Sequence, residues 1–113
     1  MTPLPFDRAH LATFTGGDLM LERELLGSFL GNAETHIKSL EDSIAAGNWS
    51  DMAHRFKGAA AGIGMQRLAD LCAQAEALHI SAQADTAKTL LAEMRSELET
   101  LAAYLKAQNA PEE

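Results

Sequence analysis

The 113-residue chain has few of the residues that break helices or build sheets. Only three prolines occur, two near the start and one near the end, and β-branched residues are scarce. Alanine, leucine, glutamate and methionine dominate instead, and these residues favour helices. The composition therefore predicts an all-helical protein, and the length fits one domain over residues 1–113.

Cysteines and long apolar runs are also rare. The single cysteine, Cys72, excludes an internal disulfide, and the N-terminus lacks the basic and apolar regions of a signal peptide. The longest run of apolar residues and glycines lies around residues 59–65, far short of the roughly 20 residues that cross a bilayer. We therefore expect a cytoplasmic protein that has no membrane partner.

Basic side chains are outnumbered by acidic ones. Sixteen acidic and nine basic residues give a net charge of −7, which argues against a nucleic-acid-binding surface because such a surface needs a basic field. One window departs from this balance: residues 52–69 contain no acidic residue, yet they include Arg55, Lys57 and Arg67. The chain thus carries one neutral-to-basic window, centred near His54.

Apolar residues recur at helical spacing in four segments. Asp18 is a good N-cap for the first of them, and Gly47 is a C-terminal stop for the same segment. The patterns predict helices at about 18–46, 48–63, 65–80 and 82–108, after an N-terminal arm or short helix at 1–15. Because short connections make sequential helices pack side by side, we expect an antiparallel up-down four-helix bundle.

The second predicted helix has an unusual outer face. At about 100° per residue, Phe56 and Ala60 fall on one apolar stripe that should face the core. His54 points the opposite way, so we expect it to be exposed. Its neighbours on that outer face include Gly58 and Ala61, although a mid-helix glycine costs about 1 kcal/mol relative to alanine.

This outer face suits a reactive imidazole. Helical side chains lean toward the N-terminus, so Gly58, which has no side chain, leaves His54 uncovered. Lys57 leans back toward the same ring and can place an ammonium beside a group held there. A neutral imidazole next to a cation suits nucleophilic attack on an anionic electrophile, of which a phosphoryl group is the obvious candidate. A solvated helix face with a chance histidine is the alternative.

The stretch AHRFKGAAAGIGMQRLADLC, residues 53–72, resembles the histidine-containing phosphotransfer (HPt) domains of two-component phosphorelays. The shared pattern is a histidine, a hydrophobic residue two positions on, Lys-Gly at +3 and +4, small residues, and glycine at +10. In this chain these residues are His54, Phe56, Lys57, Gly58 and Gly64. The segments GGDLMLERELLGSFL and AAGNWSDMAHRFKG also look like the family's preceding helix and turn, so the resemblance covers about residues 16–80.

The resemblance implies a four-helix bundle whose exposed His54 accepts a phosphoryl group from an aspartate of one receiver domain and passes it to another. Lys57 would then offset charge on the phosphoryl group, while Gly58 and Ala61 would keep the approach clear. No intrinsic cofactor or metal is implied, because Mg²⁺ in this scheme is bound by the receiver. We expect a monomeric phosphoryl carrier rather than an autonomous kinase.

Further residues are predicted to contact the partner or the imidazole. Small residues allow a receiver domain to approach closely, and the acid-free window avoids repelling its acidic pocket. The residues assigned to this partner surface are Arg55, Gly62, Met65 and Arg67. Glu76 stands where some family members have glutamine, and its carboxylate would hold the Nδ1 proton of His54 and leave Nε2 as the nucleophile. A plain surface salt bridge is the alternative for Glu76.

Other functions remain as alternatives. A self-phosphorylating histidine kinase needs a nucleotide-binding domain, but GIG lies at a helix junction and matches no phosphate loop. Arg55 also follows His54 where such kinases usually carry an acid. Direct acceptance of phosphoryl from a docked kinase, or a non-catalytic receiver-binding module, stays open. A metal site is disfavoured, because the four histidines are scattered, no HxxxH or HExxH pair exists, and Cys72 falls on an apolar stripe.

Overall fold

Helices make up most of the chain in the computed structural model, which describes residues 4–109. They are α1 (Arg8–Thr15), α2 (Leu19–Ala46), α3 (Trp49–Gly62), α4 (Gln66–Glu76) and α5 (Ala84–Asn109). Because no strand occurs within the described residues, the predicted all-helical class is confirmed. No helix in this part of the chain is long and apolar enough to span a membrane.

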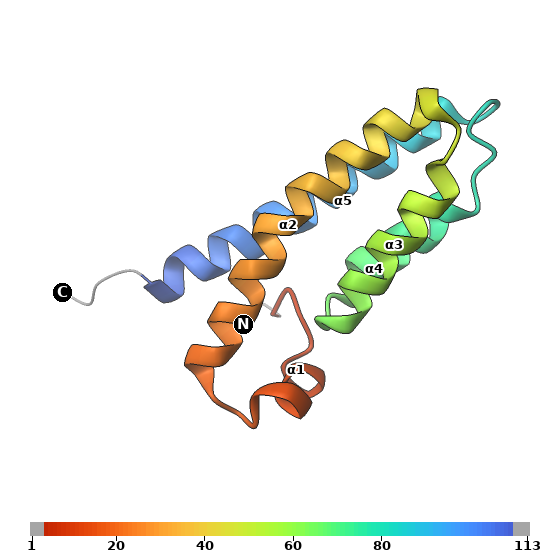
Figure 1. The fold of residues 1–113 in the computed structure, drawn as a ribbon. Helices are drawn as coiled ribbons and strands as arrows, with labels where there is room; N and C mark the ends of the chain where they lie inside the picture. Colours follow the sequence, from red (N-terminus) through yellow and green to blue (C-terminus); the bar gives the residue numbers. More distant parts are fainter. Residues whose placement is uncertain (1–3, 110–113) are drawn as a thin grey trace.

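The four longer helices form a ring of contacts. α2 packs on α3, α3 on α4, α4 on α5, and α5 on α2. Figure 1 shows consecutive helices of this ring running in opposite directions. α3 and α4 are about half as long as α2 and α5, so they cover only one end of that pair, and α1 packs against α2 near the other end (Figure 1).

The core lies between the apolar sides of these helices. Trp49 and Phe56 of α3 are fully buried, and Trp49 Nε1 donates a hydrogen bond of 2.6 Å to the carbonyl oxygen of Ala75 on α4. Cys72 is buried in the same core, and burial raises the pKa of its thiol to about 12. Its thiol therefore stays protonated at neutral pH and acts as a small apolar core residue, as expected.

The turns show why particular residues stand at the helix ends. The Asp18 carboxylate accepts hydrogen bonds from Met20 N at 2.9 Å and Leu21 N at 3.2 Å, so it caps α2 as predicted. Gly47 ends α2 with φ of 86°. Gly64, between α3 and α4, has the same φ, and a Cβ there would lie 3.0 Å from Asp7 O. Only glycine fits this position without strain.

Two helix bounds differ from the prediction. The helix expected at 65–80 ends at Glu76, and the helix expected from residue 82 begins at Ala84. Between them, His79 N donates to the Gln83 side chain at 2.8 Å, and Gln83 N donates back to His79 O at 2.9 Å. The two hydrogen bonds pair backbone N–H groups that would have bonded within a longer helix. The segment between α4 and α5 can therefore turn although it contains no proline or glycine.

An ion pair fixes α1 to the bundle. Arg8 Nε and Nη2 donate to the two oxygens of Glu22 on α2 at 2.8 and 3.0 Å, and Nη2 also donates to Tyr104 on α5 at 2.7 Å. The Glu22 side chain is only 5% exposed. Residues 8–15, expected as an arm or short helix, therefore form a helix that is held by side chains from two other helices.

Candidate functional site

His54 lies on the outer face of α3. Because Phe56 and Ala60 occupy the buried side of this helix, the periodicity places the His54 side chain outward, with 66% of its surface exposed. Its Nδ1 lies 3.0 Å from Glu76 Oε2. Among the described residues no group hydrogen-bonds Nε2, which is therefore the accessible nitrogen.

Glu76 connects this imidazole to Lys57. It is the last residue of α4, and its Oε1 accepts a hydrogen bond of 2.8 Å from Lys57 Nζ on α3. The hydrogen bond from Lys57, and secondly that from His54, lowers the pKa of the Glu76 carboxyl below its usual value. The carboxylate is thus ionised at neutral pH and can only accept hydrogen bonds.

This protonation state sets the tautomer of His54. Since the Glu76 carboxylate can only accept, Nδ1 of the neutral imidazole must carry the proton, and Nε2 holds the free lone pair. The nitrogen with the free lone pair is therefore the one that makes no contact within the described residues. The site thus brings together an exposed imidazole, a carboxylate in contact with its Nδ1 and an ammonium, all held by two adjacent helices.

The outer face of α3 on the C-terminal side of His54 carries only small residues at Gly58, Ala61 and Gly62. A Cβ placed on Gly58 or Gly62 would meet no atom within 4 Å, apart from the helix backbone, and Ala61 between them is also exposed. Arg55 is exposed next to His54 in the sequence. A partner can therefore approach the imidazole along α3 without displacing a long side chain.

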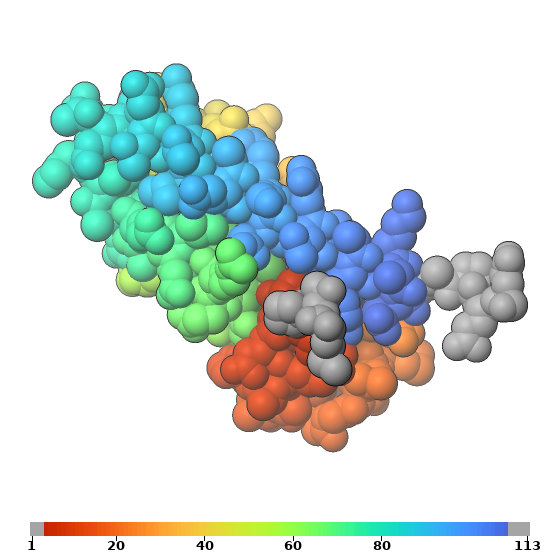
Figure 2. Space-filling view, turned by 180° about the vertical axis from the view of Figure 1, so that it is seen from behind, coloured from red at the N-terminus to blue at the C-terminus, as the bar shows by residue number. Residues whose placement is uncertain are grey.

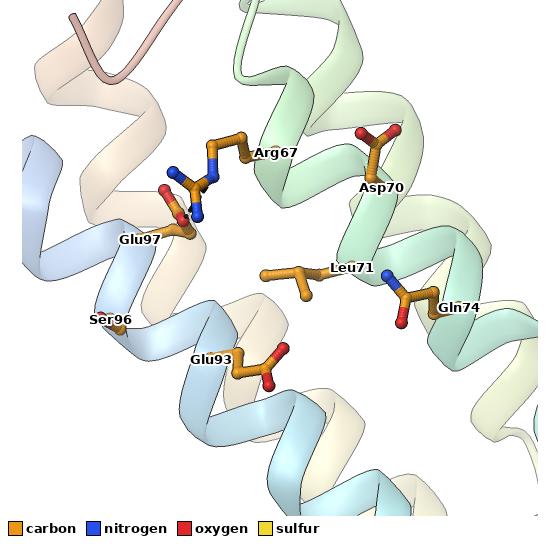
Figure 3. A pocket seen from close by; sticks show the side chains of 7 residues that line it. All are labelled: Arg67, Asp70, Leu71, Gln74, Glu93, Ser96 and Glu97. Carbon is orange, nitrogen blue, oxygen red and sulfur yellow. Dashed lines mark ion pairs between the residues drawn. The ribbon is translucent and has the colours of Figure 1, made fainter. Parts of the chain in front are cut away.

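Two residues predicted for the partner surface lie elsewhere. Met65 is only 1% exposed, because the left-handed turn at Gly64 redirects the chain and points this side chain into the core. Arg67 faces α5, where its Nε lies 3.2 Å from Glu97 Oε1 (Figure 3). The assignment of Met65 was therefore wrong, and Arg67 belongs to a different face from the His54, Lys57 and Glu76 cluster.

Two other histidines have specific contacts that the sequence analysis missed. His10 of α1 places Nε2 3.1 Å from the carbonyl oxygen of Gly62, at the end of α3. His36 of α2 stacks on Phe56 with ring centroids 4.9 Å apart, and burial lowers its pKa. No spacing in the sequence pointed to either contact, because each joins residues that lie far apart in the chain.

The site is a protruding side chain rather than a cleft. Three open grooves on the described surface have volumes of about 440, 540 and 500 Å³, and His54 lines none of them. Figure 3 shows the first, between α4 and α5, with Arg67 and Glu97 pointing toward each other across it. The described residues also contain no group of three side chains placed to hold a metal ion. The geometry suits a macromolecular partner that brings its own pocket to His54.

Comparisons with known proteins agree with the residue pattern. A protein-family model described as the Hpt domain matches residues 24–107, most of the chain. That range contains all of α3 and α4, and with them His54, Lys57 and Glu76. A search of curated proteins and a search of solved structures each found no match.

Proposed function

Because the chain belongs to the family of Hpt domains, which carry phosphoryl groups on histidine in phosphorelays, we propose that His54 is its phosphoryl acceptor. In this proposal His54 takes the phosphoryl group from an aspartate of one receiver domain and passes it to another. The observation that carries the proposal is the 3.0 Å contact between Glu76 Oε2 and Nδ1, which leaves Nε2 exposed with its lone pair.

The transfer moves one phosphoryl group and no proton. The Nε2 lone pair attacks the phosphorus of the aspartyl phosphate, the P–O bond breaks, and the receiver's carboxylate leaves. The new Nε2–P bond leaves the imidazole positively charged, because the Nδ1 proton stays in place beside Glu76. The reverse steps pass the group to the next receiver. Mg²⁺ belongs to the receiver in this scheme, and the chain itself needs no cofactor.

Lys57 provides the positive charge near the transferred group. At rest its ammonium is held by Glu76, while its side chain is 34% exposed. A lysine side chain is flexible, so the ammonium can turn from the carboxylate to the phosphoryl oxygens as charge builds up there. We assign Arg55, Gly58, Ala61 and Gly62 to the receiver-binding surface, and we propose that the protein acts as a cytoplasmic monomer.

A transfer assay tests this function. The protein is incubated with radiolabelled, phosphorylated receiver domains and Mg²⁺, and we expect a label that is acid-labile and base-stable, as phosphohistidine is. His54→Gln should abolish the label, and undiminished labelling of this variant would overturn the proposal. Labelling from ATP alone would instead indicate a kinase, and binding of receivers without any label would indicate a non-catalytic module.

The orienting role of Glu76 has its own test. A Glu76→Gln variant keeps a side-chain carbonyl that accepts from Nδ1 but loses the charge that faces the phosphorylated imidazole. We expect slower phosphoryl uptake than in the wild type, measured in the same assay. Faster uptake would show that repulsion between the carboxylate and the phosphoryl group outweighs orientation.

A further inference from the structure

Glu76 is the last residue of α4, where the chain leaves the helix for the connection to α5. Figure 2 shows this connection, in cyan, at the opposite end of the molecule from α1, in red. None of residues 77–83 in the connection is buried. The last turn of a helix frays easily, because its final carbonyl groups have no partner within the helix. The position of Glu76 therefore depends on contacts from another element.

Two side chains at the start of α3 bind this last turn of α4. Trp49 Nε1 donates a hydrogen bond of 2.6 Å to Ala75 O, and Ser50 Oγ donates one of 3.3 Å to Glu76 O. Both carbonyl groups belong to the helix end, which leaves them without a partner four residues on. Because Trp49 is buried, the surrounding core fixes its ring. The indole thus anchors the end of α4 from a rigid position.

Glu76 is held at three points by successive turns of α3. Ser50, His54 and Lys57 stand at positions i, i+4 and i+7, so they share one face of this helix. Ser50 donates to the backbone carbonyl of Glu76. His54 Nδ1 lies 3.0 Å from Oε2 of the same residue, and Lys57 Nζ donates to Oε1 at 2.8 Å. One stripe of α3 therefore contacts the backbone and both carboxylate oxygens.

These contacts do not all persist through the proposed transfer. When the Lys57 ammonium turns to the phosphoryl group, the carboxylate loses one of its two partners. A glutamate side chain has several rotamers, and a frayed backbone would add further freedom. The hydrogen bonds from Trp49 and Ser50 go to backbone carbonyls, so they remain when the partners of the carboxylate change.

We propose that Trp49 and Ser50 are positioning residues for the transfer, because they hold the last turn of α4 and thereby keep Glu76 on the imidazole. This inference rests on the function proposed above. Neither residue touches the reacting atoms, and both act through Glu76. The hydrogen bond of Trp49 is shorter and buried, whereas that of Ser50 is longer and exposed, so the loss of the first should have the larger effect.

A double-mutant cycle tests whether both residues act through Glu76. Phosphoramidate is a small donor whose P–N bond breaks with release of ammonia as the Nε2–P bond forms, so it labels His54 without a docked partner. Trp49→Phe keeps an aromatic ring without an N–H, and it should slow this labelling about threefold, against about twofold for Ser50→Ala. In a Glu76→Ala background, neither change should slow the labelling further.

The tautomer of His54 provides a readout that a loss of stability alone would not move. Nitrogen NMR shifts of the neutral ring report which nitrogen carries the proton, in folded protein and without any donor. We expect the proton on Nδ1 in the wild type and a larger share on Nε2 in Trp49→Phe and Ser50→Ala. Ser96→Ala is the control, because Ser96 is exposed on α5, which packs on α2 and α4. It should match the wild type in rate and tautomer.

The outcomes separate this inference from the proposed function. Slowing by either change that persists in the Glu76→Ala background would overturn the inference, as would an unchanged labelling rate or an unchanged tautomer. If Trp49→Phe does not fold, Ser50→Ala decides alone. Failure of every donor to label wild-type His54 would contradict the proposed function, and the tautomer would then still show whether the two residues hold Glu76 on the ring.

Discussion

Two glutamates in this molecule bind cations in the same way but lie in different surroundings. Glu22 accepts two hydrogen bonds from Arg8, and its side chain is 5% exposed. Glu76 accepts one hydrogen bond from Lys57 and one from His54, and its side chain is 29% exposed. The chemistry of the contacts is similar, and the difference lies in how much water reaches the carboxylate.

This difference separates a structural contact from the one that we propose takes part in phosphoryl transfer. A buried carboxylate that loses its cation remains as an uncompensated charge, so the Arg8–Glu22 contact holds α1 in place at all times. An exposed pair contributes about 0–1 kcal/mol, so Lys57 can leave Glu76 for another anion at little cost. In the proposed transfer, this exposure is what allows Lys57 to exchange Glu76 for the phosphoryl group.

The first prediction removes the cation that binds the buried Glu22 carboxylate. Arg8→Ala leaves the buried Glu22 carboxylate without its hydrogen-bond donors and should lower the free energy of unfolding by about 2 kcal/mol, with a fall in Tm of about 8 °C. Urea and thermal unfolding measure this change. Arg55→Ala is the control, because Arg55 is exposed, and it should change stability by less than about 0.5 kcal/mol. Equal stability of the two variants would show that the Arg8–Glu22 pair does not hold α1.

The second prediction removes the cation of the exposed pair. Lys57→Met should slow phosphoryl uptake by His54 about tenfold, because a charge beside the developing transition state is lost. Its stability should change by less than about 0.5 kcal/mol, since the pair is partly exposed. Lys57→Arg keeps the charge and should recover part of the rate. Normal uptake by Lys57→Met would mean that the ammonium takes no part in the transfer.

The sequence alone was sufficient to predict features that depend on a single helix, such as which side chains of α3 are buried and where α2 begins. Helical periodicity within α3 distinguishes the buried Phe56 from the exposed His54, because both follow from a single helix whose phase is known. Capping residues likewise indicated the start of α2 at Asp18. Positions that follow a change of chain direction were harder to predict. Met65 was expected on the outer face, but the left-handed turn at Gly64 directs its side chain into the core.

Contacts between distant segments carried little local signal. Arg8 and Glu22 are 14 positions apart, and Arg8 and Tyr104 are 96 positions apart, so no periodic pattern links them. Glu76 was considered because of the resemblance to HPt domains, and its bridge between His54 and Lys57 depends on how α4 packs on α3. Spacing along one helix was thus enough to indicate His54 and Lys57, whereas Glu76, on the next helix, was indicated by the resemblance.

The third prediction concerns how stability changes as the pH falls, through His36 in the scaffold and Glu76 in the candidate site. Burial lowers the pKa of His36, so the folded state binds its proton less readily than the unfolded state does. Stability should therefore fall as the pH drops below about 6.5, the ordinary value for histidine. Glu76 has a lowered pKa, so its ion pairs contribute fully above the ordinary carboxyl range and are lost only at lower pH.

Urea unfolding between pH 7.5 and 5 measures this response. His36→Gln should flatten the fall in stability in that range, because the titrating group is gone while the amide remains neutral. An unchanged slope would show that protonation of His36 does not control the acid response of the scaffold. We expect this effect to be smaller than that of Arg8→Ala.

The last prediction uses two glycines that share a backbone conformation but not a location. Gly58 on α3 and Gly31 on α2 are both helical, and a Cβ at either would meet no atom within 4 Å outside the helix backbone. Changing either to alanine should therefore stabilise the fold by about 0.5–1 kcal/mol. Only Gly58→Ala, one turn from His54, should slow transfer from a phosphorylated receiver, by a few-fold, while phosphoramidate labels both variants normally. Equal transfer by the two variants would show that Gly58 is not needed to leave His54 accessible to a receiver. The loss of helix stability caused by a glycine at this position would then have to serve another purpose.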